Sequence, residues 1–182
     1  VSLGLFHSSA ITSLGRLFTW GANDSGSLGD GTTTTRLTPV EITSQFNLAA
    51  DETIIDVSLG WYHSSAVTSE GRLFTWGLNS DGQLGDGTTL NKLNPTDITS
   101  QFNLVVGESI LSASLGGNFS LAVTSDGRVF TWGRNSSGQL GNGTTINSST
   151  PLDLTNNFNL NVGESIIQVS LGSGHSSALT SE

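Results

Sequence analysis

Cysteine and methionine are absent from this 182-residue chain, and only 12% of its residues are charged. Without cysteine, the chain cannot form disulfides, use a thiolate nucleophile or build the common cysteine-rich zinc sites. Six basic residues stand against fifteen acidic ones, giving a net charge of −9. We therefore expect no basic patch for nucleic-acid phosphates. No apolar run approaches the roughly 20 residues of a membrane helix, and no signal-peptide pattern opens the chain.

Glycine is abundant, with 23 residues, and the whole chain follows a repeat of 56 residues. Trp20, Trp76 and Trp132 are each 56 positions apart, and residues 57–112 match residues 113–168 at 35 of 56 positions. The predicted organisation is one segment over residues 1–182, made of units 1–56, 57–112 and 113–168 and a partial unit 169–182. We interpret both ends as cuts in a longer array.

Each unit has the pattern of short strands separated by glycine-rich turns, with no sustained helical period. In the second unit, Ile55, Val57 and Leu59 alternate with polar residues, and Gly71 is placed to supply the positive φ of a tight hairpin. Expected strands lie near residues 55–59, 64–68, 72–76 and 95–98. Residues 99–109 are compatible with one helical turn. A sheet of this size cannot bury both faces alone, so neighbouring units should pack on it.

The motifs of the second unit resemble the regulator of chromosome condensation repeat. They are Gly71-Arg-Leu-Phe-Thr-Trp-Gly-Leu-Asn79 with Gly82-Gln-Leu-Gly85, and upstream Leu59-Gly-Trp-Tyr-His-Ser-Ser-Ala-Val-Thr68; related copies lie at 15–29 and 127–141. The resemblance implies an all-β fold, a seven-bladed β-propeller, of which this segment would supply a little under half. The sequence departs from the family in the linker from Pro95 to Ile110, which is several residues longer than in typical repeats, so we expect an extra turn in the outer part of each blade.

Histidine–serine pairs recur with the repeat and raise the question of hydrolase chemistry. Adjacent strand residues point to opposite faces, which disfavours direct pairing, and Phe119 replaces histidine in the third unit. We therefore predict that the repeated residues are structural and that the chain has no catalytic residue and is not an enzyme. The predicted structural residues are Trp20, Trp76, Trp132, His7, His63, His175, Gly21, Gly77 and Gly133.

The loop from Asn79 to Gly87 faintly resembles a calcium loop, but its counterpart from Asn135 to Gly143 has lost both aspartates. Asn and Asp beside glycine are ordinary turn residues. Its glycines match no phosphate-binding motif. We predict no metal and no cofactor.

Some positions differ between units although their neighbours are identical, and they lie between strands where loops are expected. Neutral drift on solvent-facing loops is one interpretation, and a partner-binding surface is the other. The partner-binding candidates are Leu5, Phe6, Trp61, Tyr62, Asn118, Leu78 and Arg134. The segments 34–38, 90–94 and 146–150 vary in the same way.

The favoured function is a non-enzymatic protein-binding propeller module with variable loops. Two alternatives stay open: nucleotide exchange on a small GTPase, which rests on the resemblance alone, and a structural cell-surface repeat protein. Exposed strand edges also predict edge-to-edge self-association of the isolated segment, with Val1–Thr12 as one candidate strand. Composition favours a secreted or surface location and leaves a cytoplasmic one open.

Overall fold

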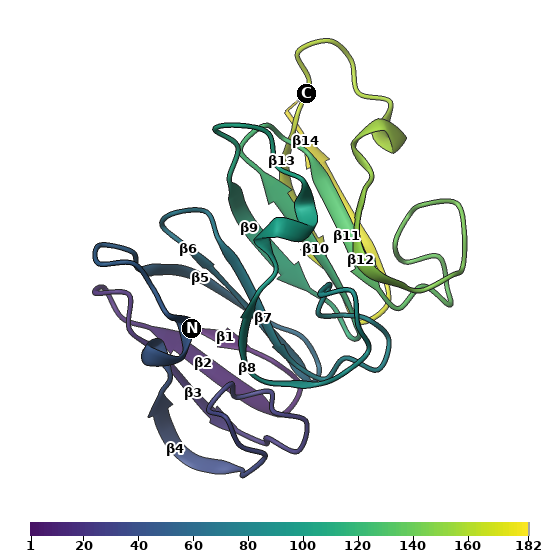
Figure 1. Ribbon diagram of the computed structural model, residues 1–182. Coiled ribbons are helices and arrows are strands. Elements are labelled where there is room, and N and C mark those ends of the chain that lie inside the picture. The colour runs from purple at the N-terminus through teal and green to yellow at the C-terminus, as the bar shows by residue number, and fades with distance from the viewer. Residues whose placement is uncertain (182) are drawn as a thin grey trace.

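The computed structural model describes residues 1–181, which form a row of antiparallel β-sheets (Figure 1). Glu182, the last residue of the predicted partial unit, lies outside the described residues. The first sheet contains β1 (Ser2–Leu3), β2 (His7–Ile11), β3 (Leu17–Gly21) and β4 (Arg36–Glu41). The second contains β5 (Ile54–Leu59), β6 (His63–Thr68), β7 (Leu73–Gly77) and β8 (Lys92–Asp97). The third contains β9 (Ile110–Leu115), β10 (Phe119–Thr124), β11 (Val129–Gly133) and β12 (Ser148–Asp153).

The strands of each sheet follow chain order from one edge to the other, so each sheet is a simple meander. A two-stranded sheet, β13 (Ile166–Leu171) and β14 (Ser176–Thr180), follows the third. The boundary between the first two predicted units falls inside β5, which begins at Ile54. Gly71 has a φ of +71°, as the hairpin between β6 and β7 requires. The strand containing Pro95 is an edge strand, where a missing N–H is tolerated.

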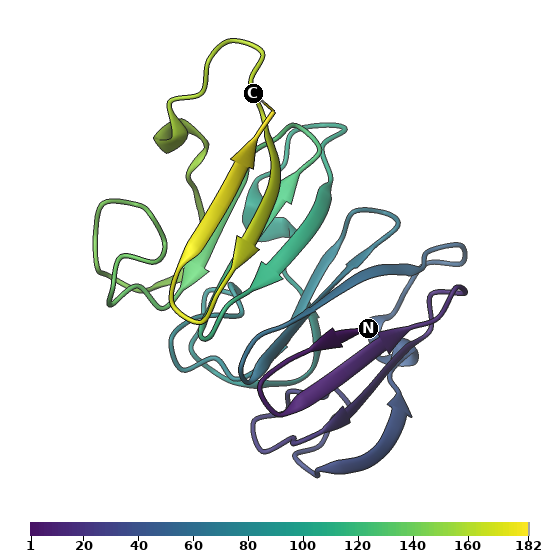
Figure 2. The ribbon, with the colours of Figure 1, turned by 180° about the vertical axis from the view of Figure 1, so that it is seen from behind.

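The sheets lean on one another in sequence, and their first strands β1, β5, β9 and β13 lie side by side. Seen from behind, the β13–β14 hairpin and the N-terminal strands lie at opposite ends of this row (Figure 2). Four-stranded sheets that pack face to face around their first strands are blades of a β-propeller. The predicted all-β, blade-like architecture is therefore confirmed.

Tryptophan and phenylalanine rings fill the spaces between neighbouring blades. Trp76 is fully buried, and its indole N–H donates to the Ser27 carbonyl of the preceding unit at 2.9 Å. The ring of Phe46 meets that indole edge-on at 5.6 Å. Phe46 ends a 3₁₀ turn, η1 (Thr43–Phe46), which recurs as η2 (Thr99–Phe102) and η3 (Thr155–Phe158). The linker therefore carries one helical turn per unit, and it places a phenylalanine on the inter-blade core.

The prediction that Val1–Thr12 completes a blade of another chain meets a geometric constraint. Residues 1–12 contain β1 and β2, which occupy the first and second places of a blade. Among residues 1–181, the fourth sheet already has those places filled by β13 and β14, and no third or fourth strand follows them. The segment Val1–Thr12 therefore does not supply what that sheet lacks.

Candidate functional site: the variable rim

The three groups of variable positions meet at one end of the blades. The amide of the residue after each third strand donates to the loop between the first and second strands: Ala22 to Phe6, Leu78 to Tyr62, and Arg134 to Asn118, each at 2.9 Å. Arg36, Lys92 and Ser148, in the third variable segments, pair with the last residues of the third strands. We call this end of the blades the variable rim. The fold thus gathers on one surface positions that are scattered along the sequence.

Aromatic and aliphatic side chains of the first two units are exposed on the variable rim. Leu5 is 47% exposed, Phe6 58% and Trp61 38%. The rings of Phe6 and Tyr62 lie 5.9 Å apart at a tilt of 42°. A hollow of about 250 Å³ lies beside them. It is lined by Phe6, His7, Ala22, Asp24, Ser27 and Tyr62. Large apolar side chains that stay exposed in a group are typical of interaction surfaces.

Trp61 lies across the backbone of the next blade. Its amide donates to the Gly117 carbonyl at 3.3 Å, and a Cβ on Gly117 would come within 3.2 Å of its indole ring. The same Cβ would lie 2.6 Å from the Ser173 carbonyl oxygen. The glycine at 117 is therefore set by close packing with its neighbours, and it does not vary freely.

Arg134 is exposed, and its guanidinium has no carboxylate partner among residues 1–181. Its Nε donates to the Ser136 hydroxyl at 2.9 Å. The other five basic residues are each ion-paired: Arg16 with Glu41, Arg36 with Asp30, Arg72 with Glu52 and Asp97, Lys92 with Asp86, and Arg128 with Glu108 and Asp153. Arg134 and Trp61 share a hollow of about 190 Å³ with Asn118. This arrangement places an unneutralised cation beside an exposed aromatic ring.

Asn118 and Leu78 are more enclosed than their place in the sequence suggests. The Asn118 side-chain amide donates to Asp81 at 2.9 Å, and Asn147 donates to the other oxygen of the same carboxylate at 3.1 Å. Asn118 therefore ties the second blade to the third, and only part of it faces the rim. Leu78 is half-buried.

The Leu-Gly pairs at the ends of the first strands lie together: Leu3-Gly4, Leu59-Gly60, Leu115-Gly116 and Leu171-Gly172. They border a shallow hollow of about 290 Å³ that also touches Leu5 and Trp61. Gly21, Gly77 and Gly133 end the third strands with positive φ, and a Cβ at Gly77 would lie 2.5 Å from the Tyr62 carbonyl oxygen. The repeated glycines thus allow the close backbone contacts from which the rim is built.

The repeated histidines bond to serines of the following unit. His7 Nε2 lies 2.9 Å from Ser64 Oγ, and His63 Nε2 lies 3.1 Å from Ser120 Oγ. Each serine hydroxyl donates to a backbone carbonyl, of Ser27 and Gln83 respectively, so the histidine nitrogen is the donor to the serine oxygen. Burial lowers the pKa of His7 to about 4 and that of His63 to about 3, so both are neutral at pH 7. Buried serines that already donate to the backbone are not arranged as nucleophiles.

The remaining repeat residues are less enclosed at the two ends of the described chain. His175 is exposed, and Trp20 is half-buried. Phe119 stands in the place of His63 and packs against Gly116 as the histidine packs against Gly60. Sequence reasoning did not find that the partners of His7 and His63 lie 57 residues further along the chain.

Sequence reasoning also missed Asp24, Ser136 and Ser137, which line the hollows of the rim. A signal for them exists, because the two residues after Asn23, Asn79 and Asn135 differ between units. Among the described residues, no group of three acidic or histidine side chains could hold a metal ion. Nor does any helix of that part of the chain have the length and apolar character to cross a membrane.

A family model described as the regulator of chromosome condensation (RCC1) repeat matches residues 15–67, 70–123 and 126–179. The probable E3 ubiquitin-protein ligase HERC6 of Homo sapiens is 36% identical over 187 residues, covering 100% of this chain and 17% of that protein. The ultraviolet-B receptor UVR8 of Arabidopsis thaliana is 34% identical over 151 residues, covering 83% of this chain and 32% of the receptor. The chain thus spans a third or less of these relatives.

Solved structures share the fold. Prp20p from Saccharomyces cerevisiae superposes with a TM-score of 0.77 at 22% identity, covering 97% of this chain and 42% of that one. A second structure of the yeast protein, bound to Kap60, gives a TM-score of 0.78 at 20% identity, with 96% and 40% coverage.

Proposed function

The chain belongs to the RCC1 repeat family, and on that premise we propose that it is a non-enzymatic protein-binding module that presents its variable rim to a macromolecular partner. The observation that carries the proposal is the clustering on one surface of positions that differ between near-identical units. Two exposed aromatic rings, Phe6 and Trp61, and the unpaired Arg134 lie on it. Trp, Tyr and Arg are the residue types most often found at interface hot spots.

The chemistry of the rim indicates what the partner offers. An arginine without an internal carboxylate can form a bidentate ion pair with an acidic group of a partner. Trp61 and Phe6 supply apolar area that gains from burial at about 25 cal/mol per Å². We therefore expect a partner surface that sets a carboxylate next to an apolar patch. The chain has a net negative charge, but salt screens its repulsion of an acidic partner at long range. The ion pair with Arg134 would form at contact, where screening is weaker.

Relatives in the fold support protein binding as the mode of action. Yeast Prp20p has been studied for its binding to Gsp1p and histones, and its complex with Kap60 has been solved. Those partners belong to that protein. They make a protein ligand the first class to test here, and guanine-nucleotide exchange and a structural surface role remain the alternatives.

The test is an affinity capture with the intact chain and two sets of variants. Trp61→Ala with Arg134→Ala removes the exposed ring and the unpaired cation. The control, Leu14→Ala with Arg16→Ala, removes an exposed apolar residue and an ion-paired arginine elsewhere on the first blade. We expect proteins captured by the wild type to be lost with the rim variant and kept with the control variant. Equal capture by all three chains contradicts a rim-binding role.

The same wild-type chain and variants also distinguish protein binding from the two alternatives, nucleotide exchange and a structural surface role. Acceleration of GDP release from a captured GTPase by the wild type, abolished in the rim variant, favours exchange activity. If no protein is captured by the wild type and lost with the rim variant, a structural role is favoured. Circular dichroism and urea denaturation establish that each variant is folded. Edge-to-edge self-association of the isolated chain stays a prediction, and sedimentation at high concentration tests it.

A further inference from the structure

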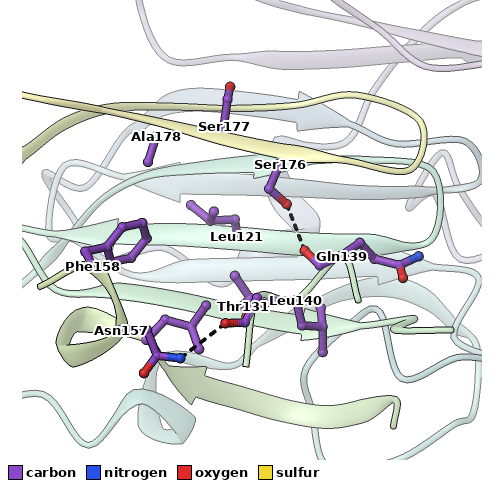
Figure 3. A pocket seen from close by; sticks show the side chains of 11 residues that line it. Leu121, Thr131, Gln139, Leu140, Asn157, Phe158, Ser176, Ser177 and Ala178 are labelled. Carbon is purple, nitrogen blue, oxygen red and sulfur yellow. Dashed lines mark hydrogen bonds between the residues drawn. The ribbon is translucent and has the colours of Figure 1, made fainter. Parts of the chain in front are cut away.

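One hollow of the variable rim, of about 250 Å³, combines aromatic rings with a carboxylate. We call it the acidic hollow; its lining is Phe6, His7, Ala22, Asp24, Ser27 and Tyr62. It lies between the first two blades, and both of these are complete four-stranded sheets. The cavity of about 210 Å³ beside the β13–β14 hairpin is lined, within residues 1–181, by uncharged side chains only (Figure 3). The acidic hollow is thus built to receive a different kind of group.

The carboxylate of the acidic hollow is available to a ligand. Asp24 is exposed and has no hydrogen-bond or ion-pair partner within residues 1–181. Two other acidic residues of the first blade, Asp30 and Glu41, each pair with an arginine. His7 also lines the hollow, and burial lowers its pKa to about 4, so at pH 7 it is neutral and does not repel a cation. The lining therefore offers an unneutralised negative charge.

This chain repeatedly holds an arginine against a phenylalanine ring and a carboxylate. The Cζ atom of Arg16 lies 5.0 Å from the centroid of the Phe18 ring, and the guanidinium pairs with Glu41. The next two units repeat the arrangement: Arg72 with Phe74 at 4.7 Å and Asp97, and Arg128 with Phe130 at 4.9 Å and Asp153. The acidic hollow presents a ring and a carboxylate of the same kind, and residues 1–181 supply it with no cation.

The arrangement of the hollow suits a guanidinium. The rings of Phe6 and Tyr62 lie 5.9 Å apart and are tilted by 42°. A cation within about 6 Å of a ring centroid is attracted by the ring, and guanidinium is the cation that most often binds in this way. Because both rings and Asp24 line the same hollow, a planar guanidinium there can stack on a ring while its N–H groups face the carboxylate.

The fold does not require this combination of residues. Adding 112 to Phe6, Ala22 and Asp24 gives positions 118, 134 and 136, which line the equivalent hollow of about 190 Å³. There the residues are Asn118, Arg134 and Ser136, so an amide replaces the ring and the charge is positive. The same place on the rim thus carries opposite charges at the two ends of the described chain.

We propose that the acidic hollow binds an arginine side chain of the protein partner, with the guanidinium stacked on the aromatic rings and paired with Asp24. The inference rests on the proposed function, because it names one residue that the partner presents to the rim. Charge complementarity supports it, since the net charge of −9 attracts a basic segment. The partner then offers an arginine to this hollow and a carboxylate to Arg134.

Tyr62 makes binding in the hollow observable, because it is the single tyrosine of the chain. The test titrates the 182-residue chain, labelled with ¹³C in the tyrosine ring, with Nα-acetyl-arginine methylamide and follows the Tyr62 signals by NMR. We expect a saturable shift. The citrulline analogue has nearly the same shape without the charge and should bind about tenfold more weakly or worse. The lysine analogue should also bind more weakly than arginine, because an ammonium is more strongly hydrated and does not stack.

Two carboxylates of the chain make a matched pair of variants. Asp24→Asn keeps the shape of the side chain and removes its charge, so it should weaken binding of the arginine probe about fivefold or more. The control is Asp51→Asn, because Asp51 is also exposed and unpaired within residues 1–181 but lies between η1 and β5, outside the hollow. It should change binding less than about twofold. Phe6→Leu should weaken binding about threefold or more.

Several results would overturn the proposal: no saturable shift, equal binding of the arginine and citrulline probes, tighter binding of lysine than of arginine, or equal effects of Asp24→Asn and Asp51→Asn. A dimer of the chain that Arg134→Ala dissociates would assign the bound arginine to a second copy, and it would also overturn the proposal.

The affinity capture separates this proposal from the function on which it rests. Loss of captured proteins with the Trp61→Ala, Arg134→Ala variant, without probe binding, keeps the rim-binding function and refutes the arginine site. Probe binding with equal capture by every chain keeps the cation site and refutes the rim-binding function. If both hold, Asp24→Asn should lower capture by the wild-type chain and Asp51→Asn should not.

Discussion

The two buried histidines predict a loss of stability at mildly acidic pH. In the folded chain, the pKa of His7 is about 4 and that of His63 about 3, because burial disfavours the charged imidazolium. The unfolded chain has a histidine pKa near 6.5. Between these values the unfolded state binds more protons than the folded state, so the free energy of unfolding falls as the pH falls through 6.5.

The magnitude follows from the size of the interval. Each histidine costs about 1.4 kcal/mol per pH unit between the unfolded and folded pKa values. From pH 7 to pH 5 the loss is about 2 kcal/mol for each residue, and about 4 kcal/mol for both. This range lies above the ordinary pKa values of the carboxyl groups. Of these, Glu108 titrates even lower, because its hydrogen bond to Arg128 lowers its pKa to about 2.

The third unit indicates which substitution removes the histidine titration and keeps the fold. Phe119 occupies the third histidine position, and Ser176, the residue equivalent to Ser120, still donates to a backbone carbonyl there. The His63→Phe and His7→Phe variants should therefore fold at pH 7. Urea denaturation, followed by tryptophan fluorescence at pH 7 and pH 5, measures the free energy of unfolding of each chain.

We expect the double variant to lose less than about 1 kcal/mol between pH 7 and pH 5. The control is His175→Phe, which makes the same substitution at an exposed histidine. If the double variant loses as much stability as the wild type, the buried histidines do not cause the acid sensitivity and the reasoning fails.

Two further comparisons test inter-blade packing and ion pairing by urea denaturation. Trp132→Ala should cost about 3–5 kcal/mol because the side chain is fully buried, whereas Trp20→Ala, at a half-buried position, should cost less than half as much. Arg128→Ala should cost about 3 kcal/mol because it leaves the enclosed Glu108 carboxylate without its main partner. Arg16→Ala breaks an exposed pair that solvent screens, so it should cost much less than Arg128→Ala; similar losses at the two positions would contradict the dependence on burial.

The candidate site was only partly predictable from the sequence. Comparing units identified Phe6, Trp61 and Arg134, which the structure places on one exposed rim. The same comparison selected Asn118, whose side chain is engaged by Asp81 of the preceding unit. A position that varies between units is one where the fold does not require a particular residue type. The variation does not indicate which neighbouring residues the side chain contacts.

The sequence by itself determined the repeat, the approximate positions of the strands in each unit and the hairpin at Gly71, because these depend on local backbone preferences and on the 56-residue period of the chain. Only the tertiary structure decided which serines His7 and His63 meet, and which carboxylates pair with each arginine of the described residues. The histidine–serine contacts, like the bond from Trp132 to Gln83, join residues 57 or 49 positions apart. Such contacts form when one blade packs on the next, and no local preference encodes them.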